Sequence, residues 1–333
     1  MIWVVGDIHG MFDPLKTLLN RIKMDIYSSE NIKNAKIIFL GDYIDHGESS
    51  KEVIDLLLEL KEEFDVVFLA GNHEDLLLQY VNESDLFKTY GNVWFKDNGA
   101  KETIVSLSPI KNLCMKNFSG RDGQNIKWNN LKIENKYLEF FNKLKYSHIE
   151  QIGTGEEVFK FVFTHAGINP EKDIDKQLDV KNYDDFHSYL KNNKEWIENS
   201  IIWMRNMPER PIENYIFING HTPTIGIDKY CSCIGNYDVQ SGKPFFNFGS
   251  KEAFYNRNGS YYYFSNVNKE DLISINIDTG AILGKYLTAI KIPDNLIEER
   301  KIQVIQVPTS GIRRSGYCKI ENYYIKVPYC STS

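Results

Sequence analysis

Five short apolar runs in this chain each lead to residue types that commonly bind metal ions. The runs lie at 2–5, 37–40, 66–69, 161–164 and 216–218, and they precede Asp7 with His9, Asp42, Asn72, His165 and His221, respectively. A single aspartate, asparagine or histidine after a strand usually has a structural role, for example as a turn or cap residue. Five such endings in one chain favour a shared site, built where several strands end.

The first 80 residues alternate these apolar runs with helical patterns. After Asp13, apolar residues at positions 15, 18, 19 and 22 share one helical face, and Ser49 is placed to cap a second helix. This alternation predicts βαβ units and a partly parallel sheet, which binds ligands at the carboxyl ends of its strands. The expected fold class is therefore α/β, with mixed β-sheets flanked by helices.

The remainder of the chain predicts a second group of strands. They are expected at 158–165, 215–219, 272–278 and 286–292, with peripheral strands in the tail. Residues 81–150 have a mainly helical and looped pattern, which places His148 in helix-like surroundings with a structural role. The same interpretation applies to His187.

These elements suit one catalytic domain over residues 1–292. Residues 293–333 form a C-terminal extension, which we expect to pack on the same domain. Residues 226–270 form an aromatic-rich insertion whose turn residues are typical of hairpins. The insertion either covers the sheet, which we favour, or forms a substrate or partner surface, since aromatic residues are enriched at interfaces.

Composition narrows the class of protein. The chain of 333 residues has a formal net charge of −6, which disfavours extended nucleic acid as a partner because that binding depends on Lys and Arg contacts to phosphates. No apolar run approaches the ~20 residues that a membrane-spanning helix needs. The five cysteines are irregularly spaced, which favours reduced thiols in the cytoplasm. Cys231 and Cys233 could bind a metal, although two loop thiols are the simpler interpretation.

The ligand set indicates which ions such a site would hold. Asp7 and His9 are two residues apart, so both side chains point the same way in an extended chain and can reach one ion. Asp42 is a carboxylate able to bridge two cations, and the other three ligands add an amide oxygen and two imidazoles. This mixture suits two divalent or trivalent ions, with manganese first and iron, zinc or nickel as alternatives. Two ions about 3.5–4 Å apart would activate a bridging water and clamp a phosphate.

The motifs around these residues resemble those of a known family. They are Gly6-Asp7-Ile8-His9-Gly10, Gly41-Asp42-Tyr43-Ile44-Asp45-His46-Gly47, Gly71-Asn72-His73-Glu74, His165-Ala166-Gly167 and Gly220-His221-Thr222-Pro223. The set is similar to the signatures of the calcineurin-like metallophosphoesterases and, within them, of the phosphoprotein phosphatase branch with its bacterial and phage serine/threonine phosphatases. The resemblance covers roughly residues 1–110 and 155–290.

This resemblance implies two metal sites with one shared ligand. The first metal would be held by Asp7, His9 and Asp42, and the second by Asp42, Asn72, His165 and His221. The fold implied is the calcineurin-like sandwich.

The resemblance also implies catalytic and substrate-binding roles. His73 would be the general acid that protonates the leaving oxygen, with Asp45 orienting its ring. Arg205, in Trp203-Met204-Arg205, would bind the phosphate, and Asn72 and His46 would also contact the substrate.

His46 departs from the family pattern, which has an arginine at this position. Arginine offers a permanent charge and a planar fork of donors, whereas a histidine is mostly neutral at pH 7. One phosphate contact is therefore weakened or replaced, and Lys101 is a candidate to compensate. The change leaves room for diesters or phosphoanhydrides as substrates.

The leading functional hypothesis is a metal-dependent phosphatase. Metal-bound hydroxide would attack phosphomonoesters such as phosphoserine or phosphothreonine, and the partner would be a phosphorylated protein or small molecule. The alternatives are a phosphodiesterase, a dinucleoside polyphosphate hydrolase or an RNA-end phosphatase. A catalytically dead scaffold is disfavoured because every expected ligand and His73 are present.

Overall fold

The computed structural model describes most of the N-terminal two thirds of the chain and the strands that follow. The described residues are 1–29, 32–85, 87, 94–95, 98–109, 132–154, 157–205, 212, 215–225, 245–247, 254–255, 262–263, 274–294, 301–309 and 321–326. The helices are α1 (Phe12–Ser28), α2 (Ser50–Glu63), α3 (Asn72–Val81), α5 (Ala100–Leu107), α6 (Asn135–Asn142), α7 (Ile174–Leu178) and α8 (Tyr183–Asn193). No helix among these residues is long and apolar enough to cross a membrane.

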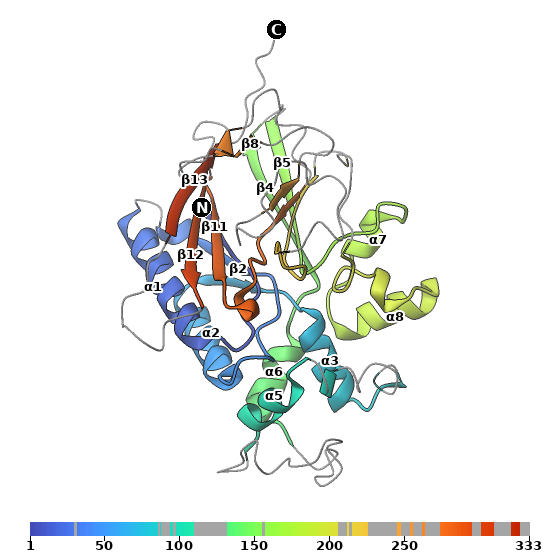
Figure 1. Cartoon of the computed structure of the whole chain (residues 1–333). Helices are drawn as coiled ribbons and strands as arrows, with labels where there is room; N and C mark the ends of the chain where they lie inside the picture. Colours follow the sequence, from blue (N-terminus) through green and yellow to red (C-terminus); the bar gives the residue numbers. More distant parts are fainter. Residues whose placement is uncertain are drawn as a thin grey trace.

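Two mixed sheets form the centre of the structure (Figure 1). The first has the order β13-β12-β11-β1-β2-β3, formed by Glu321–Lys326, Lys301–Pro308, Tyr286–Ile292, Ile2–Val5, Lys36–Phe39 and Asp65–Phe68. The second has the order β4-β5-β6-β10-β7, formed by Ser147–Thr154, Glu157–Thr164, Tyr215–Asn219, Ser274–Asn276 and Phe245–Asn247. A separate pair joins β8 (Phe254–Tyr255) to β9 (Tyr262–Tyr263).

The N-terminal strands run parallel, as the strand–helix alternation predicts. In the first sheet β1, β2 and β3 are parallel, while β11, β12 and β13 continue the sheet in antiparallel fashion. In the second sheet β5, β6 and β10 are parallel. The carboxyl ends of β1, β2, β3, β5 and β6 are the five points at which the candidate ligands follow a strand.

The alternation of side chains along each strand builds two apolar layers. In β1, Ile2 and Val4 belong to a buried cluster shared with Phe161 and Phe163 of β5, so this layer lies between the sheets. Trp3 belongs to a second cluster, shared with the apolar faces of the helices. Fully burying one Val, Leu, Ile or Phe side chain stabilises the fold by about 1.5–3 kcal/mol. Packing in both layers therefore holds the strands, and with them the strand ends, in place.

The helices cover the outer faces of the sandwich. α1 packs on β11 and β12 and against α2, and its buried residues include Leu15, Leu18, Leu19 and Ile22, the face that the sequence predicts. α2 begins directly after Ser49 as expected, although the Ser49 side chain makes no capping hydrogen bond. Figure 1 shows α7 and α8 on the side of the molecule away from α1 and α2.

The helix-like surroundings predicted for His148 are wrong, and most of the predicted insertion lies outside the described residues. His148 is in strand β4, not in helix-like surroundings; the strand is polar because it is an edge strand that pairs only with β5 among the described residues. Most of 226–270, including Cys231 and Cys233, lies outside the described residues, whereas the tail strands β12 and β13 are part of the first sheet. The division at residue 292 stays a prediction.

Candidate metal centre and active site

The structure gathers all the predicted ligands at one end of the sandwich. Asp7 and His9 follow β1, Asp42 follows β2, Asn72 begins α3 after β3, and His165 and His221 follow β5 and β6. All six side chains are buried. Their ligand atoms form two groups within 4.8 Å, namely Asp7 with His9 and Asp42, and Asp42 with His165 and His221.

The backbone at these positions adopts an unusual conformation. Seven non-glycine residues of the described chain have positive φ, and five of them belong to this site, with φ between 48° and 71°. The five are His9, Asp42, Asp45, His46 and His221. Non-glycine residues with positive φ are uncommon and cluster at functional sites, where the surroundings hold them in place. The turns after β1, β2 and β6 are therefore built to aim side chains.

Glu74 holds the turn after β2 in this conformation. Its buried carboxylate accepts hydrogen bonds from the backbone N–H groups of Asp42 (2.9 Å), Tyr43 (2.8 Å), Ile44 (3.3 Å) and Gly71 (2.9 Å). Burial and the neighbouring Asp42 raise the pKa of Glu74 to about 7. Glu74 was part of a recognised motif, but its role in fixing the turn was not predicted from the sequence.

Two motif glycines allow the carboxylates to approach the backbone. A Cβ atom on Gly71 would lie 2.0 Å from Oδ1 of Asp42, and one on Gly220 would lie 1.9 Å from Oδ1 of Asp7. Both distances are far below van der Waals contact. Glycine is therefore needed before Asn72 and before His221, because any side chain at either position would displace a carboxylate.

In the first group, one ring nitrogen of His9 is left facing the carboxylates. His9 Nδ1–H donates to the backbone oxygen of Ile44 at 3.1 Å, and Nε2 lies 3.4 Å from Oδ2 of Asp42. Oδ1 of Asp7 is buried and has no hydrogen-bond partner among the described residues. A buried carboxylate oxygen without a partner is costly, and a cation bound between Asp7, His9 and Asp42 would remove that cost.

The second group shows the same pattern of oriented histidines. His165 Nδ1–H donates to the backbone oxygen of Leu40 at 2.9 Å, and His221 Nε2–H donates to that of Trp203 at 3.0 Å. The other nitrogens, His165 Nε2 and His221 Nδ1, lie 3.0 and 2.9 Å from Oδ1 of Asn72. Backbone carbonyls commonly fix metal-binding histidines in this way, leaving the second nitrogen as the ligand.

The electrostatics of the groups favour cations. Burial raises the pKa of Asp7, and the nearby carboxylates of Asp278 and Asp42 raise it further. Burial lowers the pKa of His9 to about 3, and burial with the neighbouring His165 and Arg205 lowers that of His221. Crowded carboxylates beside neutral imidazoles are a donor set that fits divalent ions.

His73 lies beside both groups and is paired with a buried carboxylate. Its Nδ1 lies 2.6 Å from Oδ2 of Asp45, and Asp45 also accepts hydrogen bonds from Trp94 Nε1 and Thr103 Oγ1, each at 2.5 Å. Burial alone lowers the pKa of His73, but Asp42 and Asp45 outweigh it and raise the pKa to about 9. Asp45 therefore orients the ring of His73, and the two carboxylates favour its protonated form.

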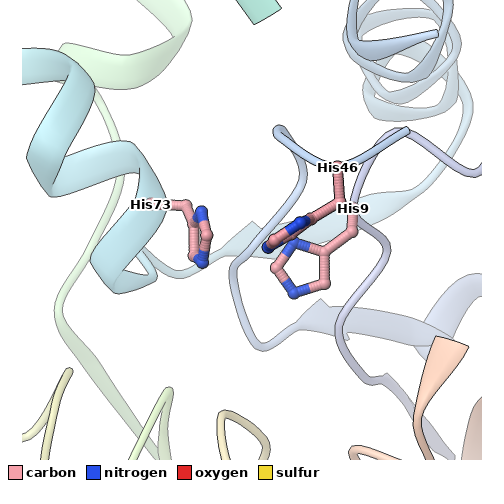
Figure 2. A group of neighbouring side chains, drawn as sticks. All are labelled: His9, His46 and His73. Atoms are coloured by element: carbon pink, nitrogen blue, oxygen red, sulfur yellow. The ribbon is translucent and has the colours of Figure 1, made fainter. Parts of the chain in front are cut away.

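The structure also places the predicted substrate-binding residues. The ring of His46 lies against those of His9 and His73, with centroids 5.0 and 5.3 Å apart (Figure 2). Arg205 is half-buried after Trp203 and is close enough to contribute to the lowered pKa of His221, after burial and His165. Lys101 is half-buried on α5.

The family model for calcineurin-like phosphoesterases matches residues 1–241 of the chain. Among curated relatives, the chain is 28% identical over 220 residues to a symmetrical bis(5′-nucleosyl)-tetraphosphatase of Wigglesworthia glossinidia brevipalpis, covering 62% of each chain. It is 25% identical over 177 residues to an asymmetrical bis(5′-nucleosyl)-tetraphosphatase of Oceanobacillus iheyensis, covering 52% of this chain and 58% of that protein. The matches therefore span less than two thirds of either relative.

Two further similarities complete the comparison. A short segment of 75 residues is 40% identical to the serine/threonine-protein phosphatase BSL2 of Arabidopsis thaliana, covering 22% of this chain and 7% of that protein. Among solved structures, a cold-active protein-tyrosine phosphatase of a psychrophilic Shewanella aligns over 96% of this chain and 79% of that chain, with 15% identity and a TM-score of 0.45.

Proposed function

This chain belongs to the calcineurin-like phosphoesterase family, and from that premise we propose that it is a phosphatase that hydrolyses phosphomonoesters with two bound metal ions. Phosphoserine and phosphothreonine are the leading substrates, carried by a protein or a small molecule in the cytoplasm. The family match and the two buried ligand groups support a hydrolase of this kind.

One observation carries the proposal more than any other. His73 lies next to two ligand groups that meet at Asp42, and its Nδ1 lies 2.6 Å from Oδ2 of Asp45. Its Nε2 lies 3.8 Å from Oδ2 of Asp42 and therefore faces the ligand groups. A proton donor beside two bound metal ions would suit the hydrolysis of alkyl phosphoesters, because their alkoxide leaving oxygen must be protonated as it departs.

The ions would be held by residues that the structure brings together. Asp7, His9 and Asp42 would hold the first ion, and Asp42, Asn72, His165 and His221 the second. When bound, two such ions would polarise phosphoryl oxygens and make a water nucleophilic near neutral pH. The mixed oxygen and nitrogen donors fit manganese first, with iron, zinc or nickel as alternatives.

The side chains of the protein would perform the remaining steps. Arg205 would neutralise and orient the phosphate, since a guanidinium can bind it with two parallel hydrogen bonds. His73 would donate the Nε2 proton to the leaving oxygen, and Asp45 would hold Nδ1 and stabilise the charged ring until that transfer.

A second candidate function follows from His46. A neutral imidazole replaces the guanidinium that the family pattern has here, and burial together with His73 lowers the pKa of His46 further. A weaker grip on a dianionic phosphate favours substrates with less terminal charge, such as diesters or phosphoanhydrides. Two relatives are named as bis(5′-nucleosyl)-tetraphosphatases, which supports dinucleoside polyphosphates as this alternative.

A substrate panel separates these functions. Initial rates would be measured with Mn²⁺ on p-nitrophenyl phosphate, a phosphoserine peptide, bis-p-nitrophenyl phosphate and diadenosine tetraphosphate. We expect the highest kcat/KM on the monoesters. A higher value on the diester or the tetraphosphate would replace the monoester assignment, and a rate that survives in His73→Asn on every substrate would refute the assigned acid. The matched control is His187→Asn, which alters an Asp–His pair outside the site, His187 Nε2 with Asp75 Oδ1 at 2.9 Å.

A further inference from the structure

Three histidine rings lie close together, edge-on or tilted to one another, beside the two ligand groups. The ring centroids of His9, His46 and His73 form a nearly equilateral triangle with sides of 5.0, 4.8 and 5.3 Å (Figure 2). One ring nitrogen from each histidine lies within 4.8 Å of the other two. His9 and His73 are buried and His46 is half-buried, so the triangle lies at the inner edge of the site.

Each ring has one nitrogen that makes no hydrogen bond within the described chain. On His73 this is Nε2, which would release its proton to solvent when a cation binds. Nδ1 of His9 is used by the backbone oxygen of Ile44, and Nδ1 of His73 is used by Asp45. The Nε2 atoms lie 3.4 and 3.8 Å from Oδ2 of Asp42, beyond the usual length of a hydrogen bond. The ring of His46 has no hydrogen bond to any residue of the described chain, although its backbone is fixed in a positive-φ turn.

We propose that His9, His46 and His73 form a third cation position, which binds a borderline divalent ion such as Zn²⁺ through three imidazoles. Zinc prefers nitrogen donors and a tetrahedral arrangement, and three histidines with one open position are an established zinc donor set. Zn–N bonds of about 2.0–2.1 Å require the nitrogens to draw together to about 3.4 Å. The partners of Nδ1, the backbone oxygen of Ile44 for His9 and the carboxylate of Asp45 for His73, already fix the two rings with Nε2 towards the triangle. Zinc-binding histidines are commonly oriented in this way.

This position excludes the first ion of the phosphatase site. His9 has only Nε2 available, and the same atom belongs to the group with Asp7 and Asp42. One nitrogen cannot ligate two ions at once, so an ion held by the three histidines removes a ligand from the first position. Where the proposed phosphatase function holds, the ion also occupies His73 and blocks its proton transfer, so excess zinc inhibits.

His46 is the residue that creates this position. It is the only one of the three without a role in the implied metal pair or in proton donation, and the family pattern has an arginine in its place. An arginine cannot ligate a cation and would repel one. The same substitution that weakens a phosphate contact therefore adds a metal ligand.

Zinc affinity tests the proposal without reference to catalysis. The metal-depleted full-length chain would be titrated with Zn²⁺ in competition with a chromophoric chelator, and with Mn²⁺ in parallel, for wild type, His46→Arg and His46→Gln. His148→Gln is the matched control, because His148 is a half-buried histidine bonded to Glu150 on β4. We expect both His46 variants to lose zinc affinity by at least about tenfold, since even a residue that only hydrogen-bonds to a zinc ligand usually contributes that much. The affinity for Mn²⁺ should change less, and the control should not change.

The position of the ion is checked in crystals. Anomalous scattering at the zinc edge should give a peak between the three rings in wild type and none there in His46→Gln. Unchanged zinc affinity in both His46 variants, or peaks only at the Asp-containing groups, would overturn the proposal. If the zinc titration and the anomalous peaks agree with the proposal but the chain hydrolyses no phosphoester, the proposed function is wrong and the zinc position still holds.

Discussion

Nδ1 of His73 lies 2.6 Å from Oδ2 of Asp45, and both side chains are buried at the edge of the two ligand groups. Asp45 is itself fixed by Trp94 and Thr103, which come from segments well beyond it in the chain. The pair therefore has a defined geometry before any substrate binds. The pair places a group that can move a proton beside the two candidate ligand groups.

Asp45→Asn should lower kcat much more than it changes KM. An amide cannot stabilise the protonated ring as a carboxylate does, so His73 loses its orientation and part of what raises its pKa, while the contribution of Asp42 remains. General acid catalysis typically contributes about 10²–10⁴-fold, and we expect a loss of kcat within that range. Steady-state kinetics on a phosphoserine peptide measure the effect, because its alkoxide leaving group must be protonated, with His187→Asn as the control. A kcat within twofold of wild type would exclude Asp45 as the orienting residue. Such a change is about the scatter of these assays and far smaller than the contribution expected of general acid catalysis.

Arg205→Ala should weaken phosphate binding. A hydrogen bond to a charged group contributes about 1.5–3 kcal/mol, which corresponds to about 10- to 150-fold in affinity. We expect a higher KM for phosphomonoesters and a weaker inhibition by inorganic phosphate, and Arg205→Lys should fall between the two because it keeps the charge without the planar fork. If phosphate inhibition and KM are both unchanged in Arg205→Ala, the assignment of this arginine is wrong.

His46→Arg should tighten binding of a phosphomonoester. The substitution restores a permanent positive charge at the position where the family pattern has one, beside His9 and His73. We expect KM for p-nitrophenyl phosphate to fall, while KM for bis-p-nitrophenyl phosphate changes less because the diester carries only one charge. An unchanged or higher KM for the monoester would show that position 46 does not contact the phosphate.

Glu150 provides a pH-dependent contribution to stability away from the site. Its carboxylate bonds Lys36 and His148, and although burial alone would raise its pKa, these partners lower it below the ordinary value of 4.5. Because the folded pKa is lower than the unfolded one, the contribution is present above about pH 4.5 and is lost as the pH falls through the folded value.

Glu150→Gln should therefore reduce the free energy of unfolding at pH 7 by at most about 1 kcal/mol, since the pair is only partly buried. The difference from wild type should shrink as the pH falls below 4.5. Urea denaturation at pH 7 and at a series of lower pH values measures it. A difference that is constant with pH would mean that the carboxylate charge does not stabilise this edge of β4.

The clustering of the candidate ligands could be predicted from the sequence because each one follows an apolar run within a few residues. Asp7, Asp42 and His165 stand at or near the end of a strand whatever the details of the fold, and parallel strands bring such ends together. The α/β class and the face of α1 followed from hydrophobic periodicity in the same way. These features depend on local sequence and on one general rule about sheets.

The groups that orient the ligands could not be predicted in this way. The backbone oxygens of Leu40 and Trp203 bind His165 and His221, but a carbonyl has no sequence signature, and its position depends on packing between distant segments. Glu74 had a signal, since it stands in the Gly-Asn-His-Glu motif, yet its contacts to the turn after β2 depend on how α3 meets that turn. Strand β4 was missed because pairing with β5, not apolar periodicity, defines it.

The central claim is that two metal ions held by these residues drive phosphoester hydrolysis. Its most direct test is to remove the metals from the full-length chain with a chelator, add back Mn²⁺ stepwise, and measure bound metal and p-nitrophenyl phosphate hydrolysis in the same samples. We expect no hydrolysis in the depleted chain and full recovery when two ions per chain are bound, with Asp42→Asn failing to recover because it removes the ligand that both groups share. Hydrolysis that survives complete metal removal, or recovery that is indifferent to Asp42→Asn, would contradict the claim.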